Sequence, residues 1–130
     1  MTNKKTLVIG ASLKPERYSN KAIHMLTESN INVLAIGLRE GKVAGISILC
    51  KDVLCKDVLS KRLYTNIHTV TLYLNAKRQE NYYDYIISLK PKRVIFNPGT
   101  ENENFYKLLT KHNIDFEVAC TLVLLRMKAF

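Results

Sequence analysis

The chain has 130 residues, which is enough for one domain spanning residues 1–130 and leaves little room for a second. Hydrophobic residues make up 47% of it and charged residues 24%, the balance of a globular protein with a packed core. No apolar run reaches the ~18 residues that a membrane-spanning helix needs. The first apolar stretch is interrupted at Gly10 and Lys14, too early for a secretory signal. These features argue against a membrane protein and predict a cytoplasmic one.

The net charge of +9 indicates an anionic partner or, equally, a basic solvated surface. A nucleotide phosphate, a nucleic acid or an acidic protein would suit this charge. The basic residues are scattered, with no dense tract and no interleaved aromatic side chains, so a nucleic-acid partner is not favoured. The three cysteines, Cys50, Cys55 and Cys120, cannot all pair, and their spacing fits no zinc site. We therefore expect reduced thiols and no metal.

Short runs that are apolar on both faces recur along the chain, which is typical of parallel strands buried between helices. We expect strands at residues 6–9, 32–37, 45–49, 68–74, 93–97 and 115–119. Between them, one helix is expected from Asn20 to about Asn30, a second over 82–89, and a third that ends at Asn113. The segment 100–103 is a candidate capping box for the third helix. Strands that alternate with helices predict an open, mostly parallel α/β sheet.

The turn after the first strand combines features that bind a phosphate group. Gly10 permits a sharp turn and a close approach of a ligand to the main chain, and the Ser12 hydroxyl can donate to a phosphate oxygen. Lys14 and Arg17 add positive charge, and Ser19 is expected to cap the following helix, whose free N–H groups face the same space. The turn keeps only one glycine of the G-x-G-x-x-G pattern, so an ordinary loop is the alternative.

Two further loops refine this hypothesis. The loop at 97–103 also enters a helix, but Glu101 and Glu103 would repel a phosphate, so it is better placed to cap the pocket or contact a non-phosphate group. After the second strand, Arg39 and Lys42 stand where an NAD-binding protein usually places an acid on the adenosine ribose. They favour a phosphorylated ribose, as in coenzyme A (CoA) or NADP, although Glu40 lies beside them.

Three segments in order are more specific than any one alone. They are Leu7-Val8-Ile9-Gly10-Ala11-Ser12 with Pro15, Arg17, Tyr18 and Ser19, then Asn97-Pro98-Gly99-Thr100-Glu101-Asn102, then Ala119-Cys120-Thr121-Leu122-Val123. They resemble the small CoA-binding domain proteins, stand-alone relatives of the nucleotide-binding domain of the succinyl-CoA synthetase α subunit. The resemblance spans nearly the whole chain except residues 50–66. It implies a Rossmann-like three-layer sandwich with a mostly parallel sheet of five to six strands in the order 3-2-1-4-5.

The resemblance also implies bound CoA or acyl-CoA. Carried over by position, residues 10–12 and Arg17 would contact the diphosphate, and Arg39 and Lys42 would lie near the adenosine and its 3′-phosphate. Leu74 and Asn75 would border the pantetheine. The predicted cofactor-binding residues are Gly10, Ala11, Ser12, Lys14, Arg17, Tyr18, Ser19, Arg39, Lys42, Leu74 and Asn75.

No catalytic set emerges from the spacing of nucleophiles and bases. His24, His68 and His112 fit packing, strand-edge or capping roles, and Cys120 fits a small buried hydrophobe. The leading hypothesis is a non-catalytic module that senses or carries CoA or acyl-CoA. The alternatives are a small NADP-type redox sensor or reductase subunit and, on charge alone, a nucleic-acid-associated regulator.

Two segments stand outside this scheme. Residues 121–130 are strongly apolar and are expected to dock on the sheet as a helix or strand, with a homodimer contact as the alternative. The sequence Cys-Lys-Asp-Val-Leu occurs twice in succession, at 50–54 and 55–59, and we interpret it as a local duplication within one helix and loop.

Overall fold

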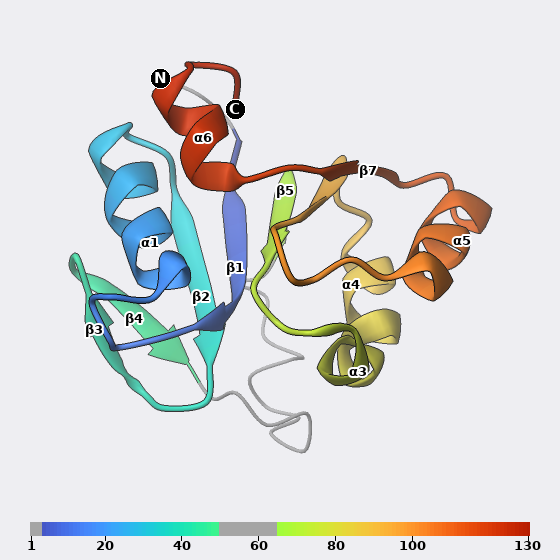
Figure 1. The fold of residues 1–130 in the computed structure, drawn as a ribbon, viewed down its shortest axis with the longest axis horizontal. Helices are drawn as coiled ribbons and strands as arrows, with labels where there is room; N and C mark the ends of the chain where they lie inside the picture. The colour runs from blue at the N-terminus through green and yellow to red at the C-terminus, as the bar shows by residue number, and fades with distance from the viewer. Residues whose placement is uncertain (1–3, 50–64) are drawn as a thin grey trace.

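A computed structural model describes residues 4–49 and 65–130 (Figure 1). Its centre is a seven-stranded sheet in the order β3-β4-β2-β1-β5-β6-β7. The strands are β1 (Thr6–Ala11), β2 (Val33–Gly37), β3 (Gly41–Val43), β4 (Ile46–Leu49), β5 (Thr69–Leu72), β6 (Arg93–Phe96) and β7 (Asp115–Val118). The duplicated Cys-Lys-Asp-Val-Leu segment and the helix expected there lie outside the described residues.

Neighbouring strands run parallel in every described pair except β3 with β4, which is antiparallel. The strands expected in the order 3-2-1-4-5 are β4, β2, β1, β5 and β6, which are adjacent in that order, so the Rossmann-like class is confirmed. The predicted count of five to six strands was too low. The missing strand is β3, whose three residues are too few for a sequence pattern. It returns onto β4 through Ala44 and Gly45, both with positive φ.

Helices cover both faces of the sheet, which gives three layers. They are α1 (Tyr18–Glu28), α3 (Ala76–Gln79), the 3₁₀ helix η2 (Glu80–Tyr82), α4 (Tyr83–Leu89), α5 (Glu103–Lys111) and α6 (Thr121–Arg126). α1 and α6 pack on one face, while α4 and α5 pack on the other. Asn30 and Asn113 follow their helices with φ of 60°, as their left-handed tolerance predicts. No helix in the described residues is long and apolar enough to span a membrane.

The predicted start of the first helix was wrong. α1 begins at Tyr18, so its N-cap is Arg17, whose side chain makes no capping hydrogen bond. Ser19 therefore lies inside the first turn, where it is buried. The helix predicted over 82–89 also begins earlier, because α3 and η2 precede α4 without a break.

The predicted capping box at 100–103 was wrong as well. The N-cap of α5 is Asn102, whose side-chain oxygen accepts from the Phe105 N–H at 3.2 Å. Thr100 is not available as a cap because its hydroxyl donates to the Asn97 carbonyl at 2.7 Å. The Glu101 carboxylate instead accepts from the Gly99 N–H at 3.0 Å.

The core is divided between the two faces of the sheet by the alternation of side chains along β1. Leu7 and Ile9 point to the face covered by α4 and α5, where Phe96 packs edge-on against Phe105 with ring centroids 5.7 Å apart. Val8 points to the opposite face, where Ile23 of α1 belongs to the same buried cluster. All six side chains are fully buried, so β1 is enclosed on both faces.

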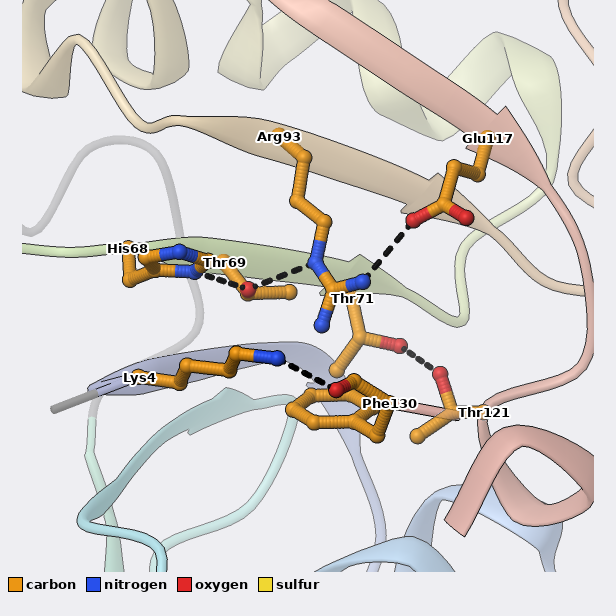
Figure 2. A network of polar contacts seen from close by, with 8 residues as sticks. All are labelled: Lys4, His68, Thr69, Thr71, Arg93, Glu117, Thr121 and Phe130. Atoms are coloured by element: carbon orange, nitrogen blue, oxygen red, sulfur yellow. Dashed lines mark hydrogen bonds and ion pairs between the residues drawn. The ribbon is translucent and has the colours of Figure 1, made fainter. Parts of the chain in front are cut away.

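A buried hydrogen-bond network holds α6 against the sheet. Figure 2 shows the Thr71 and Thr121 hydroxyls, which lie 2.8 Å apart. The Asn97 side-chain nitrogen donates to the Thr71 hydroxyl at 2.7 Å and to the Leu72 carbonyl at 2.9 Å. The Asn97 side-chain oxygen accepts from the Thr121 N–H at 2.8 Å. One amide therefore joins β5, the end of β6 and the start of α6.

The last described residue docks beside the same network. Phe130 lies under the Arg93 guanidinium, 4.4 Å from the ring centroid, and its carbonyl accepts from the Lys4 ammonium (Figure 2). Arg93 also donates to Thr69 and forms an ion pair with Glu117, both at 2.9 Å. The expectation that this segment docks on the sheet is confirmed, as a helix and a short tail. The homodimer contact stays a prediction.

Replacing Asn97 by Leu should destabilise the fold, because it leaves the buried Thr121 N–H and Leu72 carbonyl without their partner. We expect the free energy of unfolding to fall by about 2–4 kcal/mol, measured by urea unfolding. Asn104→Leu on the exposed surface of α5 is the matched control and should change it by no more than about 0.5 kcal/mol. Equal losses in the two variants would contradict this role of Asn97.

Candidate functional site

A cavity of about 860 Å³, called the cleft below, lies at the carboxyl ends of β1, β2, β5 and β6. The chain leaves β1 for β2 on one side, while β5 lies on the other, so the cleft occupies the topological switch point of the sheet. Its lining consists of Gly10, Ala11, Ser12, Leu13, Lys14, Arg17, Tyr18, Ser19, Ile36, Gly37, Leu38, Arg39, Tyr73, Leu74, Asn75, Arg78, Asn81, Tyr82, Pro98, Gly99 and Thr100.

The floor of the cleft requires two glycines. Gly10 has a φ of +94°, and a Cβ there would lie 2.9 Å from the Tyr73 carbonyl carbon. A Cβ on Gly37 would lie 2.3 Å from the Ala11 carbonyl oxygen. The pairing of β1 with β2 shifts between Ile9 and Ala11, so the chain bends outward at Gly10. Main chain rather than side chains therefore forms the floor, and a ligand can approach it closely.

The loop after β1 is held in shape by its own polar groups. The Ser12 hydroxyl accepts from the Lys14 N–H at 3.1 Å, and the buried Asn20 side chain donates to the Ser12 carbonyl at 2.9 Å. The first turn of α1 contains no acid and no side-chain cap, so its N–H groups remain suited to an anion. Asn20 thus holds the loop against the start of α1.

The structure brings together all the predicted site residues except one. Lys42 lies exposed on β3, outside the cleft, because β3 turns the chain back along the edge of the sheet. Residues 98–100 line the cleft, in agreement with the role expected for the loop after β6. The prediction missed Arg78 and Asn81 on α3 and η2. Asn75 was the available signal, since it caps α3 by accepting from the Arg78 N–H at 3.0 Å.

Two buried amides fix the far wall of the cleft. The Gln79 side-chain nitrogen donates to the carbonyls of Leu74 and Thr100, each at 2.8 Å, and so joins the loops that follow β5 and β6. Its oxygen accepts from the Asn102 side chain at 2.8 Å, which also donates to the Tyr83 hydroxyl at 2.8 Å. This network is buried and makes the wall a fixed part of the fold rather than a mobile loop.

The cleft is strongly positive. Its charged lining residues are Lys14, Arg17, Arg39 and Arg78, and no Asp or Glu of the described chain lines it. Residues 10–12, 37–39 and 98–100, which lie at or just after the ends of three different strands, line the same cleft. The arrangement suits a ligand with several negative charges.

Tyr73 lies beside Gly10, and its N–H donates to the Ile9 carbonyl at 2.8 Å. Its hydroxyl is buried and has no hydrogen-bond partner in the described chain. Burial raises the pKa of Tyr73 to about 12, and the nearby hydroxyls of Thr121 and Thr71 offset only part of this effect. At neutral pH the side chain is therefore an uncharged wall and not a base.

The fold is that of a Rossmann-like α/β protein, with a cleft at its switch point. Residues 4–126 match the CoA binding domain family, and the chain belongs to that family. No protein of curated function matches it.

Solved structures share the fold of this chain. A crystal structure of an uncharacterized protein is 39% identical in sequence, with 98% of each chain covered and a TM-score of 0.85. A hypothetical protein from Pyrococcus horikoshii OT3 is 26% identical, with 98% of this chain and 83% of that chain covered and a TM-score of 0.77. A Rossmann-fold NAD(P)-binding family protein from Shigella flexneri is 15% identical, with 88% and 65% covered and a TM-score of 0.60. This last likeness shows the fold alone.

The buried phenol should make stability fall at high pH. A tyrosine in the unfolded chain ionises near pH 10, whereas Tyr73 in the fold keeps its proton to about pH 12. Raising the pH above about 10 therefore favours the unfolded state. Between about pH 8 and about pH 11, urea unfolding of Tyr73→Phe should lose less stability than the wild type. Tyr18→Phe, at an exposed tyrosine, should follow the wild type. Identical pH dependence of wild type and Tyr73→Phe would contradict the prediction.

Proposed function

We propose that this chain is a binding module that takes CoA or an acyl-CoA into the cleft and catalyses no reaction alone. The observation that carries this proposal is the charge of the cleft, where cations stand beside main-chain amides without any acid of the described chain. CoA bears a diphosphate and a 3′-phosphate, which are the charges such a site would neutralise. Membership of the CoA binding domain family supports the same ligand.

The order of the strands gives the ligand a direction. The diphosphate would lie over residues 10–12 and the start of α1, with Lys14 and Arg17 beside it. Arg39 follows the neighbouring strand β2 and would meet the 3′-phosphate of the adenosine. Leu74 and Asn75 follow β5, on the other side of β1, and would border the pantetheine. The ligand would thus cross the carboxyl ends of β2, β1 and β5 in turn.

A binding role without catalysis fits the side chains of the cleft. His24, His68, His112 and Cys120 do not line it, and neither does any carboxylate of the described residues. Tyr73 is held neutral by burial. The described lining therefore offers no base that could activate a nucleophile. A sensor or a carrier of CoA is the activity that these features favour.

An NADP-type dinucleotide binder, as a redox sensor or reductase subunit, is the second candidate. One observation favours it: Arg39 lies where the 2′-phosphate of NADP would also lie in a Rossmann-like fold. The two candidates differ in the other half of the cleft, where NADP places a nicotinamide and CoA places pantetheine.

Binding of CoA, NADP, NAD and ADP, measured side by side by calorimetry, tests the proposal. We expect CoA to bind most tightly and NAD least tightly, because NAD lacks the additional phosphate. A ligand present at a hundred times its Kd adds about 2.7 kcal/mol to stability, so thermal unfolding gives a second readout. Strong stabilisation by NADP with none by CoA would favour the second candidate. Tight duplex DNA binding with steep salt dependence would instead support a nucleic-acid-associated regulator.

Arg17→Gln tests the site assigned to the diphosphate. Loss of one charge-assisted contact should weaken both CoA and ADP by about tenfold to a hundredfold, measured by calorimetry. Lys107→Gln is the control, since Lys107 is an exposed cation on α5 that does not line the cleft. If Arg17→Gln binds CoA as tightly as this control does, the assignment of Arg17 is wrong.

A further inference from the structure

One cation of the cleft stands apart from the other three. Lys14 and Arg17 lie in the loop after β1, and Arg39 follows β2, whereas Arg78 lies on α3 after β5. Because β1 separates β2 from β5, the strands that lead to Arg39 and Arg78 are about 10 Å apart. Three cations therefore gather where the nucleotide phosphates are expected, and Arg78 lies in the other half of the cleft.

The charge of Arg78 is not neutralised by the described part of the chain. Its guanidinium has no hydrogen bond or ion pair there, although its backbone N–H donates to the Asn75 side chain at 3.0 Å. The acids nearest in sequence, Glu80 and Asp84, do not line the cleft, and neither does Glu101. The Glu101 carboxylate is engaged by the Gly99 N–H at 3.0 Å. The exposed guanidinium is therefore available to a ligand.

The surroundings of Arg78 are polar but uncharged. Asn75, Asn81 and Thr100 line this half of the cleft, together with the apolar walls of Leu74 and Tyr82. The wall is rigid, because Gln79 next to Arg78 is hydrogen-bonded to both flanking loops. A cation carried on this wall, among amide and hydroxyl groups, is suited to one carboxylate, which a guanidinium can bind through two parallel hydrogen bonds.

The chemistry of CoA leaves Arg78 without a partner. All the phosphates of CoA belong to its nucleotide end, and the pantetheine arm that would extend past β5 is neutral. A cation at this end is matched only if the acyl group brings its own negative charge. We propose that Arg78 binds a carboxylate at the end of the acyl chain, so that the cleft selects carboxyacyl-CoA over neutral acyl-CoA. This inference rests on the proposed binding of CoA and on its direction across the sheet.

Two stable thioethers of CoA, which differ by one charge, test the inference. The first carries a 2-carboxyethyl group on the CoA sulfur, and the second carries the 2-carbamoylethyl amide of nearly the same size. By calorimetry, the wild type should bind the carboxylate about tenfold more tightly than the amide. Arg78→Gln should abolish this preference, because it lowers the affinity for the carboxylate thioether more than the affinity for CoA. Lys77→Gln, which changes an exposed cation on the same helix outside the cleft, should keep the preference.

The other outcomes separate this inference from the proposed function. Equal affinity of the wild type for the two thioethers overturns the inference while CoA binding stands. If Arg78→Gln weakens CoA as much as it weakens the carboxylate thioether, Arg78 binds a phosphate and the inference is again wrong. If neither CoA nor either thioether binds the wild type, the proposed function itself fails, and the inference falls with it.

Discussion

The main chain of β1 passes so close to the main chain after β5 that only glycine fits between them. A Cβ at Gly10 would lie 2.9 Å from the Tyr73 carbonyl carbon, which is closer than real Cβ contacts allow. This contact sets the separation of the two strands at the switch point, and the positive φ of Gly10 bends the chain toward the loop that carries Lys14 and Arg17. The floor of the cleft, the direction of that loop and the start of α1 all follow from it.

The buried side-chain amides of Asn97 and Gln79 position the other loops around the cleft. Asn97 closes the end of β6 against β5 and α6, and Gln79 joins the loops that form the far wall. In both cases one side chain hydrogen-bonds main-chain groups of two different segments, so removal of either would leave buried polar atoms unpaired. The groups that stabilise this end of the sheet are therefore the ones that shape the cleft, which couples stability to the geometry of the site.

The sequence predicts much of the fold, because runs such as Leu7–Ile9 and Val94–Phe96 are buried on both faces and leave a clear apolar pattern.

The prediction of helix starts from the sequence fails where more than one residue could act as the N-cap. Ser19 is a good N-cap by residue type, but α1 begins at Tyr18, so its N-cap is Arg17. Thr100 is also a good N-cap by residue type, but its hydroxyl donates to the Asn97 carbonyl, and the N-cap of α5 is Asn102. Arg78 was not predicted as a site residue, because it lies on a four-residue helix that is too short to show a helical pattern of apolar residues. Lys42 was expected near the adenosine, but it lies on β3, which runs antiparallel to β4 and leads the chain away from the cleft.

The position of β1 between β2 and β5 also affects the order in which the sheet folds. Its first ladder joins Thr6 to Val33, which is local, while its second joins Thr6 to Thr69 and closes a loop more than twice as long. The second ladder costs more chain entropy and should form late in folding. Until it forms, Gly10 has no opposing chain, and half of the cleft does not exist. A ligand can therefore bind in the complete cleft only after the whole sheet has formed. Such a ligand stabilises the whole domain rather than one loop.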